Sequence, residues 1–296
     1  MNTSTPRWVP LWSLLVAVLV VVASVSGLTD PDVYAQETAN WTTQAKGQDL
    51  GNLLAVVVLL VSADRYRRGS ARAGLVWLGT LLYLVYAFIV YAVAVHLNGL
   101  FLVYVAVLGL SAWAVIFHHG ALRRAALTFP SGGIRRTASA VIVTVGLLFT
   151  GMWLGELVPA LLSGEVPASL VEAGLWVNPI HVIDLSMVLP AFVLTGVAAW
   201  RGRGWGLFWL GPWLVFSALM GASIVAAMLL MAGGGGQGTL PPTVLVSVVV
   251  LASLAAAAAH LRRPTPRPTG RDVAAVPAED ASVVSPAASS AGVRGR

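Results

Sequence analysis

The residues best suited to chemistry lie in the stretch Asn178-Pro179-Ile180-His181-Val182-Ile183-Asp184, at the start of an apolar segment. His181 and Asp184 are three residues apart, so on a helix they share a face and can interact. Pro179 suits a first helical turn, where its missing N–H costs nothing, and Asn178 is then placed to cap that turn. A histidine paired with a carboxylate predicts a proton-exchanging or metal-binding group.

A second pair, Asp49 and Asn52, has the same spacing at the start of another apolar segment. Ionisable residues within a membrane span cost roughly 2.5–3.5 kcal/mol on insertion scales, and they usually mark a functional site or a buried partner. The remaining polar groups fall at the ends of other apolar segments, at the same predicted depth. The sequence therefore predicts one polar site that opens to the extracytoplasmic side. Its candidate residues are Asp49, Asn52, Glu156, Asn178, His181 and Asp184, with His96, Tyr86 and Tyr91 as possible lining.

A plainer interpretation is that these are interfacial helix ends, where polar side chains reach water and cap the backbone. We favour it for His96 and Glu156. Asp184 lies about one turn inside its segment and is harder to explain in this way, so the functional interpretation is favoured for His181 with Asp184. The same holds for Asp49 with Asn52.

The elements that position these residues follow from composition. Hydrophobic residues make up 57% of the 296 residues and charged residues only 10%, against roughly 25% charged in ordinary soluble domains. A soluble fold could not bury so much apolar sequence, so lipid must be the solvent for most of it. Cysteine is absent, which excludes disulfides and thiol chemistry.

Apolar segments of membrane-spanning character predict an all-α, polytopic transmembrane helix bundle of about eight spans. The second segment is short, with a re-entrant hairpin as the alternative. The first has a basic start and small residues near its end, so a cleaved signal peptide is its alternative. The segments lie near 11–28, 50–63, 73–96, 99–117, 137–158, 180–200, 205–232 and 241–261.

The basic residues predict the orientation. With the N-terminus inside, all seventeen arginines fall on the cytoplasmic side, and only Lys46 lies outside. The positive-inside rule then places both termini in the cytoplasm and the protein in the cell (cytoplasmic) membrane. Because the basic residues flank apolar segments, we expect the lipid bilayer, and not nucleic acid, as the partner of this basic chain.

An internal repeat is the next prediction. Residues 74–79, Gly-Leu-Val-Trp-Leu-Gly, match residues 206–211, Gly-Leu-Phe-Trp-Leu-Gly, at an offset of 132. A parallel four-plus-four duplication would divide the bundle (1–262) into halves 1–136 and 137–262. Chance similarity in a Leu/Gly/Trp-rich chain is the alternative. The segment 263–296 is rich in Pro, Ala and Ser and is predicted to be a disordered cytoplasmic tail, able to dock a protein partner.

Four stretches, at 47–50, 83–91, 153–156 and 178–181, together resemble uncharacterised multi-pass membrane proteins of high-GC (actinobacterial-type) bacteria. The resemblance implies residence in a membrane and no particular activity. Three classes of function therefore stay open. A transporter-like protein is weakly favoured by the predicted repeat and the outward polar site. The alternatives are a membrane-embedded metal- or haem-dependent enzyme, and a sensor, assembly or structural partner protein.

Overall fold

The fold is all α-helical. A computed structural model describes residues 8–125, 127–234 and 240–262. Within these residues, eight helical segments are long and apolar enough to cross a membrane. The protein is therefore a multi-pass membrane protein, as the composition predicts. The predicted tail, 263–296, lies outside the described residues.

The helices follow one another with short connections. The sixth crossing combines three consecutive elements: α7, the π-helical turn η2 and α8. The elements are α1 (Trp8–Thr29), the 3₁₀ turn η1 (Pro31–Tyr34), α2 (Ala39–Arg67), α3 (Ala71–Ala94), α4 (Phe101–Arg124), α5 (Gly132–Ser163), α6 (Ala168–Ala173), α7 (Pro179–Ile183), η2 (Asp184–Val188), α8 (Leu189–Trp200), α9 (Gly204–Gly233) and α10 (Leu240–His260).

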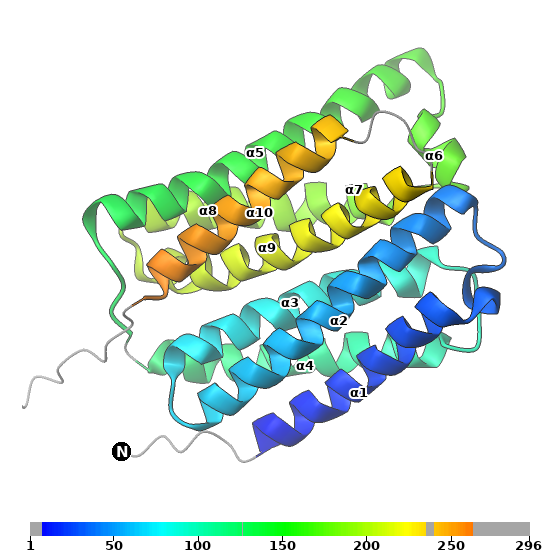
Figure 1. Ribbon diagram of the computed structural model, residues 1–296. Helices are drawn as coiled ribbons and strands as arrows, with labels where there is room; N and C mark the ends of the chain where they lie inside the picture. Colours follow the sequence, from blue (N-terminus) through cyan, green and yellow to red (C-terminus); the bar gives the residue numbers. More distant parts are fainter. Residues whose placement is uncertain (1–7, 126, 235–239, 263–296) are drawn as a thin grey trace, which may run out of the picture. The chain divides into compact units, whose positions relative to one another are not determined.

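Two sets of four helices make up the bundle (Figure 1). In the first set, α1 and α3 each pack against both α2 and α4. In the second set, α5 and α9 each pack against both α8 and α10. Each set is thus a closed ring of antiparallel helices, which is the arrangement that short connections favour.

The two sets meet where α9 packs against α2 and α3. Small residues allow the close approach of α2 to α9. A Cβ on Gly47 would lie 2.3 Å from Ala227 Cα, and one on Gly51 would lie 2.4 Å from Ser223 Cβ. Small residues four apart on both helices let two backbones come together, which is a common device for packing helices in lipid.

The arginine-bearing connections all lie at one end of the bundle, the left in Figure 1. This arginine-rich end holds the α2–α3, α4–α5 and α8–α9 connections and the end of α10. Gly69 and Gly202 form two of these tight turns at φ of +93° and +75°, a conformation that glycine adopts without strain. The opposite, arginine-poor end holds the α1–α2, α3–α4 and α5–α7 connections, the end of α9 and the start of α10.

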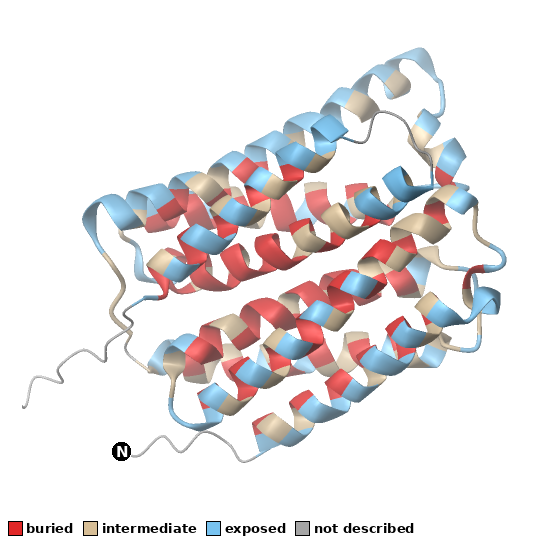
Figure 2. Ribbon diagram, viewed as in Figure 1, coloured by how far each residue is buried: buried red, intermediate tan, exposed pale blue. Residues whose placement is uncertain are grey.

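Burial separates central from peripheral helices (Figure 2). In the most apolar 18-residue stretch of α3, 72% of the residues are buried. The corresponding share is 17% in α5 and 22% in α10. The outward faces of α5 and α10 carry large apolar side chains such as Leu154 and Leu251. In a bilayer, lipid tails would solvate these faces.

The second span differs from its prediction. The sequence predicts a short apolar segment at 50–63, whereas α2 is one helix of 29 residues that begins at Ala39. Its polar first part is held by tertiary contacts, and Thr38 caps it by accepting a hydrogen bond from the Trp41 N–H. The continuous helix contradicts the re-entrant alternative.

The first glycines of the two repeated segments share one contact at the same offset. A Cβ on Gly74 would contact Tyr66 in α2, and one on Gly206 would contact Ala198 in α8. Tyr66 and Ala198 are also 132 residues apart. The duplication itself, with its halves 1–136 and 137–262, stays a prediction.

Candidate functional site

The sixth crossing starts as the sequence predicts. Asn178 Oδ1 accepts a hydrogen bond from the Ile180 N–H at 2.9 Å, and Pro179 occupies the first turn of α7. This cap fixes where the helix begins. His181 and Asp184 are thereby directed into the protein, with exposures of only 5% and 8%.

Asp184 is held by residues of two other helices. Its Oδ2 accepts a hydrogen bond from Trp153 Nε1 at 2.8 Å, and its carboxylate also accepts the Tyr86 hydroxyl. Trp153 belongs to α5 and Tyr86 to α3, so this carboxylate joins the two sets of helices. Asp184 is the first residue of η2, and its backbone carbonyl accepts a hydrogen bond from the Leu189 N–H.

The backbone around Asp184 is irregular for a local reason. Pro190 follows η2 and has no N–H to donate to the preceding turn. The widened π-helical turn accommodates that missing bond. Single π-helical turns within α-helices are frequent at functional sites.

His181 has a different partner from the one predicted. Its Nε2 lies 3.8 Å from Glu156 Oε2, and its ring lies 4.5 Å from the Trp153 ring, centre to centre. Ser169 donates a hydrogen bond to Glu156 Oε1. The structure thus pairs His181 with Glu156 and Asp184 with Trp153, because the two side chains point toward different neighbours although they share a helix.

A second polar cluster surrounds Asp49 inside the first set of helices. The Tyr91 hydroxyl donates to Asp49 Oδ1 and the Tyr34 hydroxyl to Oδ2, each at 2.8 Å. Asp49 is only 1% exposed. Burial, and then the neighbouring Asp49 carboxylate, raise the pKa of Tyr34, so that its hydroxyl stays a donor.

Asn52 extends this cluster toward α9. Its Oδ1 accepts hydrogen bonds from the Tyr83 hydroxyl at 3.1 Å and from Gln48 Nε2 at 3.2 Å. Gln48 Oε1 in turn accepts the Ser223 hydroxyl at 3.2 Å. A continuous set of hydrogen bonds therefore runs from η1 through α2 and α3 to α9.

A cavity of about 820 Å³ separates the two polar clusters. Helices α2, α3, α5, α8, α9 and α10 contribute to its wall, together with η2, and most of the lining is apolar. Asp184, Tyr86 and Trp153 line one part of it, and Gln48 and Tyr91 line another. The volume is in the range typical of small-molecule sites, roughly 300–1,000 Å³.

The most exposed lining residues lie on α5 and α10. Leu147 is 58% exposed, Leu245 is 49% exposed and Met152 is 45% exposed. These helices are also the least buried of the bundle. The most exposed part of the cavity wall is therefore formed by α5 and α10, on the side where lipid would lie.

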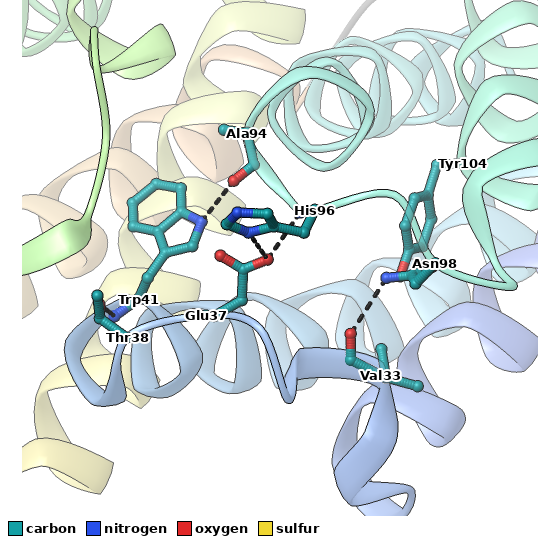
Figure 3. Close-up of polar contacts among 8 residues, drawn as sticks. All are labelled: Val33, Glu37, Thr38, Trp41, Ala94, His96, Asn98 and Tyr104. Atoms are coloured by element: carbon teal, nitrogen blue, oxygen red, sulfur yellow. Dashed lines mark hydrogen bonds and ion pairs between the residues drawn. The ribbon is translucent and has the colours of Figure 1, made fainter.

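His96 lies elsewhere, in the connection after α3 (Figure 3). Its Nδ1 lies 3.0 Å from Glu37 Oε1, and its backbone N–H donates to the same oxygen at 2.7 Å. Trp41 Nε1 donates to the Ala94 carbonyl beside this pair. These contacts attach Glu37 and the start of α2 to the end of α3. His96 therefore stabilises a loop and does not line the cavity.

The structure thus distributes the predicted site residues over two polar clusters and one loop contact. Glu156, His181 and Asp184 gather at one cluster, and Asp49 and Asn52 at the other. Tyr86 and Tyr91 line the cavity between them, and Asn178 acts as a cap. Within the described residues, no group of three or more His, Asp or Glu side chains is placed to hold a metal ion.

Sequence reasoning missed several members of these clusters: Tyr34, Gln48, Trp153 and Ser223. One signal was available, because Gly47-x-x-x-Gly51 is a small-residue motif that predicts close helix contact. It could have placed the neighbouring Gln48 at a helix junction. No protein-family model, curated protein or solved structure matches this chain.

Proposed function

We propose that the protein is a transporter-like protein of the cell membrane that takes up an amphipathic ligand from the bilayer. The cavity carries this proposal. A space of about 820 Å³ with mainly apolar walls suits an apolar chain or ring system, and its most exposed lining residues lie on α5 and α10, two lipid-facing helices. We propose that the cavity opens to lipid on this side. A ligand that is already dissolved in the membrane could enter by that route.

The distribution of polar groups supports an amphipathic ligand. Asp184 lies five residues after Pro179, about 8 Å along the helix axis from its start at the arginine-poor end. Apolar residues such as Phe192, Phe216 and Val249 line the part of the cavity nearer the middle of the helices. A lipid-like molecule places its head and its tail in that same order within one leaflet.

Backbone irregularity supports movement. The π-helical turn η2 and Pro190 interrupt the regular hydrogen bonding of the sixth crossing beside the cavity. Such interruptions are places where helix segments can change their relative angle. We propose that the arginine-poor end is extracytoplasmic, as the arginine distribution predicts, so the ligand would enter from the outer leaflet.

Filling the cavity tests this function. Gly151 lines the cavity and has no atom within 4 Å of the position of its Cβ, so Gly151→Phe should be tolerated and should occupy the space. Gly155→Phe, one turn further along α5, is the matched control, because it also has free space but does not line the cavity.

The assay uses purified protein in nanodiscs and fluorescent single-chain amphiphiles with cationic, neutral and anionic heads. We expect saturable binding of at least one probe, weakened about tenfold or more by Gly151→Phe and unchanged by Gly155→Phe. In proteoliposomes, that probe should cross the bilayer faster than in protein-free vesicles. Absence of saturable binding, or equal binding by Gly151→Phe and the wild type, would refute the cavity as the binding site.

A further inference from the structure

Asp184 is a buried carboxylate without a described cationic partner. Its hydrogen bonds come from the Trp153 indole and the Tyr86 hydroxyl, which are both neutral donors. Among the described residues, no ion pair reaches Asp184. A buried charge in a low-dielectric site is strongly stabilised by an opposite charge nearby. When Asp184 is ionised, the site therefore lacks the positive charge that would stabilise its carboxylate.

The nearest histidine on the same helix does not supply that charge. His181 stands one turn before Asp184, yet its ring nitrogen lies next to Glu156 and its ring packs on Trp153. The arginines of the described residues lie at the arginine-rich end of the bundle, and none of them lines this cavity. Among the described residues that line the cavity, Asp184 is the only Asp, Glu, Lys, Arg or His.

The rest of the wall suits a cation as well. Aromatic rings attract cations through their negatively charged faces, by about 0.5–1 kcal/mol at exposed sites and about 2 kcal/mol or more when desolvated. An anionic head would meet a like charge in a desolvated setting, which is strongly unfavourable. The aromatic residues of the lining are Trp41, Tyr86, Tyr91, Phe149, Trp153, Phe192 and Phe216.

We propose that the ligand of this cavity is a cationic amphiphile whose positively charged head lies beside Asp184, between Trp153 and Tyr86, with its apolar part directed toward the middle of the bundle. This inference rests on the proposed function, because it assumes that the cavity binds an amphiphile. Beyond the proposed function, it specifies the charge of the ligand and names Asp184 as the residue that recognises this charge.

The test compares head groups of different charge on one chain. Three dansyl-labelled dodecyl amphiphiles, with trimethylammonium, neutral hydroxyl or sulfonate heads, are titrated against the full chain in nanodiscs of zwitterionic lipid. For the wild type we expect the trimethylammonium probe to bind at least tenfold more tightly than the neutral probe. The sulfonate probe should bind more weakly than both.

Asp184→Asn removes the charge and keeps the shape. In this variant we expect the preference for the cationic probe to fall below about threefold, while the affinity for the neutral probe stays within about twofold of the wild type. Asp49→Asn is the matched control. Asp49 is also buried and accepts hydrogen bonds from tyrosine hydroxyls, but it does not line the cavity, so this variant should keep the preference.

The outcomes separate the two proposals. Equal affinity of the wild type for cationic and neutral probes overturns the assignment of charge, and so does a preference that survives Asp184→Asn. The cavity proposal stands in either case if Gly151→Phe still weakens binding. If Asp184→Asn does not fold, the comparison of head groups on the wild type decides the question alone.

Discussion

Glycine at position 47 is required for the contact between the two sets of helices, and alanine there should push them apart. A Cβ on Gly47 would lie 2.3 Å from Ala227 Cα and 2.4 Å from both its N and Cβ. Carbon atoms pack at about 3.5–4.0 Å, so Gly47→Ala requires a local separation of about 1 Å or more. Two of the three contacted atoms are backbone, so no side-chain rotation relieves the clash.

The expected cost follows from two effects. Overpacking of a well-packed interior costs about 1–3 kcal/mol. The same displacement would lengthen the Ser223–Gln48 hydrogen bond from 3.2 Å to beyond bonding distance. Interhelical hydrogen bonds in membrane proteins are worth about 0.6 kcal/mol on average. We therefore expect Gly47→Ala to lower the free energy of unfolding by about 2 kcal/mol relative to a matched glycine substitution.

Gly109→Ala is that reference. Gly109 lies within α4 and has no atom within 4 Å of the position of its Cβ. Alanine gains roughly 0.5–1 kcal/mol over glycine inside any helix, and comparing the two variants cancels this gain. The free energy of unfolding is measured by reversible titration of mixed micelles with sodium dodecyl sulfate.

A double variant tests the geometry itself. Ala227→Gly removes the Cβ at 2.4 Å but leaves the Cα at 2.3 Å, so it should restore only part of the stability lost by Gly47→Ala. A difference below about 0.5 kcal/mol between Gly47→Ala and Gly109→Ala would refute the close approach of α2 and α9, since such a contact cannot accept a methyl group at that cost. Full restoration by Ala227→Gly would refute the backbone contact.

Two further predictions concern orientation and the Asp49 cluster. The chain has no cysteine, so single cysteines can be introduced at Ser163 and Ser131. An impermeant maleimide should label the first from the outer face of the membrane and the second only from the cytoplasmic face, as in inverted vesicles. The reverse pattern would overturn the proposed orientation. Gly27→Ala would place a Cβ 2.4 Å from Asp49 Oδ2 and 2.5 Å from the Tyr34 hydroxyl, so it should lower the free energy of unfolding by about 1–3 kcal/mol, and unchanged stability would contradict the described packing.

The spans could be predicted because lipid imposes a strong constraint on sequence. A segment of about 20 apolar residues has few alternatives in a chain this poor in charge. The polar start of α2 escaped prediction for the opposite reason. Residues 39–49 are polar enough to suggest a loop, and only contacts from distant residues, such as Tyr91 to Asp49, make a buried helix of them.

The partners in the site could not be predicted from spacing. Spacing shows that His181 and Asp184 share a helix face, yet it does not show which helices pack beside that face. Gln48 and Ser223 are 175 residues apart, and the small-residue motif beside Gln48 predicts a helix contact without identifying the partner helix. The cavity is harder still to foresee, because it depends on where side chains fail to fill space.

Two residues at the predicted repeat offset have different surroundings. At the offset of 132 residues, Asn52 in α2 corresponds to Asp184 in the sixth crossing. Asn52 is 0% exposed, and Gln48 and Tyr83 fill the space around it with hydrogen bonds. Asp184 lines the cavity, and the hydrogen bond that its carboxylate accepts from Trp153 comes from a neutral donor. The residue in the first set of helices is therefore enclosed by packing, whereas the residue in the second set is a carboxylate that faces the cavity.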